Sequence, residues 1–168
     1  MKKYVVLLII VIAMITLSGC LKVNYPELPE NPVVFEMGEY IDKSDDEAGY
    51  SAIEYNGRIY MPYGTIKRAI NSDDIDKCIG YVVQDGQKDT DERIYTLSED
   101  KANNYLMMYY VGESLMNQPD FWRAVDTNGK NIDTPIYIES FNYNYWKIDW
   151  IILQINVYRF GELQVYGV

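Results

Sequence analysis

The side chains that could do covalent chemistry are few in this sequence, which contains no histidine. Without an imidazole there is no base for a Ser-His-Asp or Cys-His pair, and no ligand for the zinc sites that include histidine. The two cysteines, Cys20 and Cys78, are too few for a zinc site built of thiolates. Covalent catalysis would then need a Ser-Lys pair or a pair of carboxylates, and the sequence contains no recognisable motif for either kind of pair. The sequence therefore predicts a protein that is not an enzyme and has no metal or cofactor.

Cys20 stands at the end of a segment with the three parts of an export signal. Lys2 and Lys3 come first, an apolar run over residues 4–15 follows, and the small residues Ser18 and Gly19 directly precede Cys20. The run is shorter than the roughly 20 residues that span a bilayer, and it has the length of a secretory apolar region. An ordinary secretory signal and an uncleaved anchor are the alternatives.

The stretch Leu17-Ser18-Gly19-Cys20 resembles the lipobox of bacterial lipoproteins. The resemblance implies lipid on the Cys20 thiol and cleavage between Gly19 and Cys20. Two acyl chains hold a protein stably on a bilayer, where one chain binds only reversibly. The expected location is therefore the cell membrane, with the chain lipid-anchored and facing outside the cytoplasm.

Cleavage would leave 149 residues with a strongly acidic balance. Loss of Lys2 and Lys3 leaves 13 Lys and Arg against 25 Asp and Glu, a net charge of −12. Such a charge repels nucleic acid and anionic lipid headgroups and attracts cationic partners. Acidic surfaces also serve solubility alone, so this observation is not specific.

The chain divides into three parts. Residues 1–19 are the predicted lipoprotein signal peptide. Residues 20–32 carry the lipidated cysteine and an extended tether, because Pro26, Pro29 and Pro32 favour a semi-rigid spacer that lifts a domain off the bilayer. Residues 33–168 form a single globular β-rich domain.

Short strands dominate the expected domain. The clearest are residues 51–55 and 58–62, which alternate in polarity around Asn56-Gly57, the strongest short hairpin signal. Pro62 should end the second strand or occupy an edge. A further strand over 78–84 should bury Cys78 as a small apolar side chain.

Other segments are less regular. In the segment 104–111, residues 105–110 are apolar on every side, and the length of the segment favours a buried strand. Residues 65–70 are expected to form a short helical turn and 87–92 a polar loop. Residues 146–158 alternate with a parity slip, which predicts a bulge near Ile151 and Ile152. The predicted fold is β-rich and mostly antiparallel, either α+β or a small sandwich or barrel.

Sixteen tyrosines follow Cys20, four times the number of phenylalanines. Tyrosine is common in sheets, and it is also enriched in binding surfaces because it offers a large ring with a polar tip. The candidate binding face consists of the aromatic residues Trp122, Tyr143, Tyr145, Trp146 and Trp150.

Two acidic groups resemble cation sites only loosely: Asp73, Asp74 and Asp76, and then Asp89, Asp91 and Glu92. Neither has the ligand spacing of a calcium loop, so both are interpreted as turns. The favoured function is a non-catalytic binding module on the cell surface for a cationic peptide, a glycan or an envelope protein. The alternatives are an accessory structural subunit of an envelope complex and, less favoured, a hydrolase that uses carboxylates.

Overall fold

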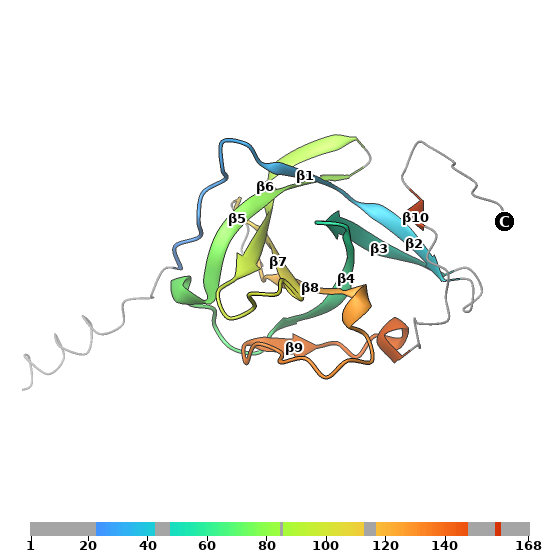
Figure 1. Cartoon of the computed structure of the whole chain (residues 1–168). Coiled ribbons are helices and arrows are strands. Elements are labelled where there is room, and N and C mark those ends of the chain that lie inside the picture. The colour runs from blue at the N-terminus through green and yellow to red at the C-terminus, as the bar shows by residue number, and fades with distance from the viewer. Residues whose placement is uncertain (1–22, 43–47, 85, 113–116, 148–156, 159–168) are drawn as a thin grey trace, which may run out of the picture.

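The computed structural model describes residues 23–42, 48–84, 86–112, 117–147 and 157–158. Most of this part is β-strand, and the strands form a mostly antiparallel sheet that curls into a near-closed barrel (Figure 1). The strands are β1 (Val33–Glu36), β2 (Gly38–Asp42), β3 (Ala48–Tyr55), β4 (Arg58–Ile66), β5 (Ile75–Gln84), β6 (Gln87–Leu97), β7 (Tyr105–Tyr110), β8 (Asp120–Ala124), β9 (Ile138–Ser140) and β10 (Val157–Tyr158). Three short 3-10 helices accompany them: η1 (Ser72–Asp74), η2 (Val125–Thr127) and η3 (Asn144–Lys147). The β-rich, mostly antiparallel prediction is confirmed, and the architecture is a barrel.

Strands β3 and β4 form the predicted hairpin. Tyr55 pairs with Arg58 across a two-residue turn, and Asn56 and Gly57 have φ of 52° and 72°. Both values lie in the left-handed region, which Asn and Gly adopt at the lowest cost.

The barrel closes through two consecutive strands, β1 and β2. The first pairs in parallel with β5, with Phe35 opposite Val82, and the second pairs antiparallel with β3. Between β5 and β3 the sheet continues through β6, β7, β8 and β4, so the ring returns to its start (Figure 1). This closure removes most exposed strand edges.

Pro62 lies within β4, at a point where the strand changes neighbours. On one side of β4, the pairing with β3 ends at Tyr60 and the pairing with β9 begins only at Gly64. On the other side, the pairing with β8 shifts its register between Pro62 and Gly64. The proline therefore occupies a locally unpaired edge beside a bulge, as the sequence predicts for an edge proline.

Two local predictions are wrong. Residues 65 and 66 continue β4, because β9 pairs with both of them, and so no helical turn forms there. Residues 87–92 belong to β6, although they are polar. Their partners decide this conformation, since Gln87 and Asp89 pair with Gln84 and Val82 across the turn.

Among the described residues, one apolar cluster fills the barrel interior and two more lie on its outer surface. Strand β7 shows why its sequence is apolar throughout: Leu106 and Met108 belong to the interior cluster, and Tyr105 and Met107 to an outer one. Both faces of this strand are covered, which explains the missing alternation. Cys78 in β5 is buried in the outer cluster, as predicted.

Residues 23–32 are extended but do not form a free spacer. Tyr25 stacks on Tyr109 with ring centroids 4.1 Å apart, and Leu28 packs on the same outer cluster. The proline spacing correctly indicates an extended chain, but the apolar contacts of Val23, Tyr25 and Leu28 hold its first part on the barrel. The spacer prediction is therefore wrong for these residues. Cys20, Trp150 and the predicted bulge near Ile151 lie outside the described residues.

Candidate functional site

Three of the five predicted aromatic residues lie together at η3. Tyr143 and Tyr145 are stacked with centroids 5.1 Å apart, and Trp146 lies 5.7 Å from Tyr145. Their closeness follows from their adjacency in the sequence. Trp150, the fourth, lies outside the described residues.

Trp122, the fifth, was wrongly assigned to this face. It points into the barrel, where it is 4% exposed, because it alternates with Phe121 and shares the inner side of β8 with Ala124. Its indole Nε1 is buried and, among the described residues, has no hydrogen-bond partner.

Tyr145 and Trp146 hold η3 against the sheet. Both donate hydrogen bonds to the carbonyl oxygen of Pro62, which the gap between β3 and β9 leaves accessible. The Trp146 ring also faces Arg123, whose guanidinium carbon lies 5.3 Å from its centroid and 5.2 Å from that of Tyr63. These two aromatic side chains therefore have a structural role.

Phe141 and Tyr143 form the exposed part of the aromatic group. They are 50% and 37% exposed, and their rings meet edge to face at 5.6 Å. Phe141 is fixed by a hydrogen bond from its backbone N–H to the carbonyl of Tyr63, and Asn142 between the two rings has a φ of 52°. The pair is thus held on a structured turn.

Strand register brings two carboxylates to the same end of the barrel. Glu92 pairs with Tyr110 across β6 and β7, and Met108, two residues before Tyr110, pairs with Asp120 on β8. Side chains opposite each other in antiparallel strands share a face, and so do residues two apart on one strand. Glu92, Tyr110 and Asp120 therefore lie on the inner side, at one mouth of the barrel.

Burial raises the pKa of Tyr143, and the negative charge of Asp120 raises it further. Strand register places the aromatic pair close by, because Thr65 on β4 pairs with Asp120 on one side and, on the other, with Glu139, two residues before Phe141. We call Glu92, Tyr110, Asp120, Phe141 and Tyr143 the acidic rim.

The two carboxylates of the rim are held in unfavourable surroundings. Burial raises the pKa of Glu92, and the negative charges of Asp89 and Asp120 raise it further. Asp120 is exposed where β8 begins, but the protein around its carboxyl group removes enough solvent to raise its pKa. Within the described part of the chain, neither carboxylate makes an ion pair or accepts a hydrogen bond.

Several other carboxylates do have donors. Asp74 shows the contrast: burial acts to raise its pKa, but hydrogen bonds from Arg68 at 2.9 and 3.1 Å and from the Asn71 N–H lower it overall. Three more donor–acceptor pairs are Arg58 with Asp126, Arg93 with Glu27, and Thr96 with Asp76. The acidic group around Asp74 therefore shapes a turn, as predicted, whereas Asp89, Asp91 and Glu92 lie in strand β6, so the turn interpretation is wrong for them.

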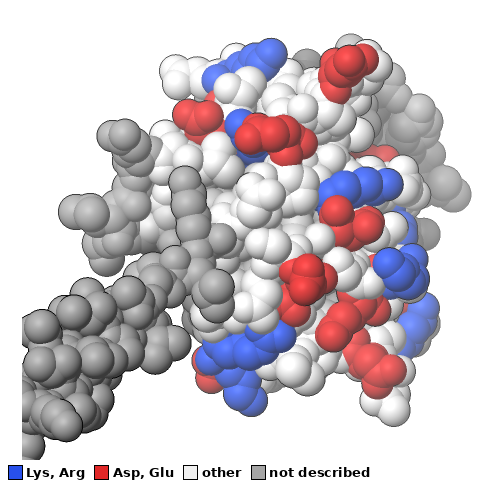
Figure 2. All heavy atoms as spheres, turned by 90° about the vertical axis from the view of Figure 1, so that its left-hand side faces the viewer, with Lys and Arg blue, Asp and Glu red and all other residues white. Residues whose placement is uncertain are grey.

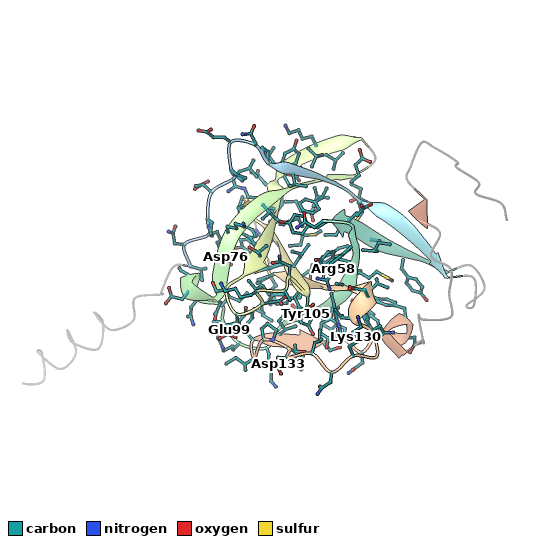
Figure 3. The ribbon with its side chains drawn as sticks, in the orientation of Figure 1. Arg58, Asp76, Glu99, Tyr105, Lys130 and Asp133 are labelled. Carbon is teal, nitrogen blue, oxygen red and sulfur yellow. The ribbon has the colours of Figure 1, made fainter. Side chains whose placement is uncertain are left out.

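A second polar cluster surrounds Arg58, labelled in Figure 3, at the other mouth of the barrel. Its guanidinium donates to Asp126, to the carbonyls of Ala102 and Asn103, and to the side chain of Asn104. These acceptors engage both terminal nitrogens and Nε, so the cluster ties loops to the β3–β4 hairpin and has no donor left for a ligand.

Sequence reasoning missed Asp120, Tyr110 and Phe141, and it interpreted Glu92 only as part of an acidic turn, whereas Glu92 lies in β6. One signal was present: Glu92 and Asp120 each stand two residues before an inward apolar residue, Ile94 and Trp122 respectively. A carboxylate in phase with a buried face is unusual and points to a site at the end of a strand. The sequence, however, does not show which strands lie side by side, so it could not reveal that Glu92 and Asp120 meet.

No family model matches the chain, and neither a curated protein nor a solved structure matches it. Within the described residues, no group of three acidic or cysteine side chains could hold a metal ion. In that same part, no helix has the length and apolar character needed to cross a membrane.

Proposed function

We propose that this protein is a membrane-anchored, non-catalytic binding module that captures a cationic amphipathic peptide at the acidic rim. Lipid on Cys20 would anchor it outside the cytoplasm. The observation that carries the binding proposal is the pair of half-buried Glu92 and exposed Asp120, which strand register brings to one mouth of the barrel and which have no donor among the described residues. The exposed rings of Phe141 and Tyr143 accompany them.

A cationic side chain would supply what the rim lacks. An ammonium or guanidinium between Glu92 and Asp120 would form charge-assisted hydrogen bonds, each worth about 1.5–3 kcal/mol. Phe141 and Tyr143 add ring faces for the same cation and apolar area for its neighbours. Arg123 shows that a guanidinium packs well against rings of this protein, since it lies against Tyr63 and Trp146.

The whole chain supports the same ligand charge. A net charge of −12 after cleavage would steer cationic peptides toward the domain from a distance. This effect is screened by salt, whereas contacts at a partly enclosed site are screened less.

Both carboxyl groups would gain from a cationic ligand. Burial raises the pKa of Glu92 and of Asp120, and a positive charge placed between them would favour the ionised form of each.

The test is calorimetric titration with a short amphipathic peptide rich in Lys and Arg, and with the same peptide carrying Glu at those positions. We expect only the cationic peptide to bind, more weakly as salt rises. Glu92→Gln and Asp120→Asn should each weaken binding about tenfold, as expected for one charge-assisted contact.

A matched control removes the same charge elsewhere. Glu99 and Asp133, labelled in Figure 3, are exposed loop residues that do not belong to the rim. Glu99 follows the end of β6 at Leu97, seven positions along the chain from Glu92. Glu99→Gln with Asp133→Asn removes two negative charges, as does the double rim variant Glu92→Gln with Asp120→Asn. If both double variants bind equally well, general acidity explains the attraction and the rim proposal fails.

A further inference from the structure

The N-terminal residues of the described chain are fixed next to η1. The backbone N–H of Asn24 donates to Ser72 Oγ at 2.9 Å, and Arg93 on β6 pairs with Glu27 at 3.2 Å. With the stacked ring of Tyr25 and the packed side chain of Leu28, these contacts hold the segment along the barrel wall. We call residues 23–32 the strap.

We propose that the strap orients the anchored domain, so that the barrel surface around η1 and Val23 lies against the lipid bilayer. This inference rests on the proposed lipid on Cys20. Beyond an anchor, the proposal specifies which surface of the barrel meets the membrane and requires the domain to be held close to the bilayer in a fixed orientation.

The length of the free connection carries the argument. Only three Cα–Cα steps separate Cys20 from Val23, which span at most about 11 Å. If all of residues 20–32 were a free polyproline-type spacer, the reach to Val33 would be about 40 Å. A domain of 149 residues has a radius of gyration of about 15 Å, so an 11 Å connection leaves it little freedom to turn over.

The charges on this side are compatible with contact at a bilayer. Figure 2 shows acidic and basic side chains interspersed on the face where the N-terminal segment lies. Two of the basic side chains in the region, Arg68 and Arg93, are paired with Asp74 and Glu27. The strong negative charge of the whole chain is thus not concentrated on the face shown, and repulsion from anionic lipids is reduced there.

The rim stays clear of this contact. Ser72 precedes β5, whose first residue Ile75 pairs with Leu97 at one end of β6. Glu92 is five residues further along β6, roughly 16 Å away at the rise of a strand. A ligand could therefore reach the rim while η1 lies at the membrane.

The test measures energy transfer from a dye on the full lipidated protein to an acceptor on lipid headgroups of neutral phosphatidylcholine vesicles. Dyes are placed at Asp73→Cys in η1 and, separately, at Lys130→Cys, since both positions are exposed. Figure 3 shows Lys130 far from Asp76, which lies three residues after Asp73. The native Cys78 is buried and burial raises its pKa, so it should not take the dye.

We expect much stronger transfer from position 73 than from position 130. A six-residue Gly-Ser insertion between Lys22 and Val23 leaves every strap contact intact and should abolish the difference. Tyr25→Ala with Leu28→Ala should do the same by releasing the strap. Glu30→Gln changes an exposed strap residue that takes part in none of these contacts, and it should leave the difference unchanged.

Equal transfer from both positions in the unmodified protein, or a difference that survives the insertion, would overturn the proposal. Failure of the lipid anchor is seen separately: the protein then lacks the lipid mass on Cys20 and does not sediment with vesicles, as expected for Cys20→Ser.

Discussion

Gly80 provides the sharpest test of how the barrel closes. It lies on β5 opposite Val33 of β1, and a Cβ added there would be 2.8 Å from the Val33 carbonyl carbon and 2.9 Å from Cε2 of Phe35. The carbonyl oxygen of Val33 would be closer still. Because backbone atoms cannot yield as a flexible side chain would, Gly80→Ala must push β1 away from β5.

The expected cost follows from what β1 holds in place. Overpacking alone costs about 1–3 kcal/mol, and losing the site of a buried phenylalanine costs about 3–5 kcal/mol. Phe35 is 1% exposed and fills the interior cluster, so we expect Gly80→Ala to lower the free energy of unfolding by about 3 kcal/mol. For a domain of this size, that corresponds to a fall in Tm of roughly 6–12 °C.

Urea unfolding followed by tryptophan fluorescence measures this change, with Gly129→Ala as the control. Gly129 has a φ of 68° and no atom near the added Cβ, so alanine there meets only the backbone penalty of about 1 kcal/mol. Equal losses for the two variants would refute the claim that β1 lies tightly across Gly80.

Three further predictions follow from the charged and polar side chains. Glu92→Gln with Asp120→Asn should unfold at higher urea concentration than the unmodified protein at pH 7, and the advantage should disappear near pH 4. The folded-state pKa values of these carboxyls are raised, so the stability they contribute at low pH is lost as the pH rises through those values. Asp74→Asn should cost about 1 kcal/mol at pH 7 in urea unfolding, as for a lost helix cap, and its effect should shrink as the pH falls below about 4, because the folded-state pKa is lowered. Trp122→Phe should change the free energy of unfolding by less than about 1.5 kcal/mol, since the smaller ring also removes a buried donor without a partner among the described residues.

Local signals in the sequence predicted the parts of the fold that depend on neighbours in the chain. The Asn56-Gly57 turn forms because both residues tolerate positive φ, whatever the rest of the barrel does. The strand over 104–111 was ambiguous, because apolar residues on every position fit a buried helix as well as a strand covered on both faces.

Long-range pairing decided the remaining elements. Gln87 and Asp89 extend β6 because a hairpin register places them beside β5, although their side chains are polar. The closure by β1 and β2 requires one chain segment to pair in parallel with β5 and then antiparallel with β3, and no local pattern specifies such a change. Propensity is a weak guide where tertiary contacts supply the partner.

The same distinction between local signals and long-range strand pairing applies to the candidate functional site. Tyr143, Tyr145 and Trp146 were grouped correctly because they are neighbours in the sequence. Trp122 was misplaced because its side of β8 depends on strand parity. Glu92 and Asp120 were not connected at all, since 28 positions separate them and only the β6–β7–β8 register brings them together.

The contrast between Asp74 and the rim bears most directly on function. Asp74 is a buried carboxylate, and the chain supplies it with an arginine and a backbone donor. Glu92 and Asp120 also lose solvation, yet no donor among the described residues compensates them, so their charge lowers stability at neutral pH. Glutamine and asparagine have nearly the same shapes and would avoid that cost. Stability is commonly sacrificed where function needs an unfavourable arrangement, so a partner from outside the chain is the economical explanation for the two charges.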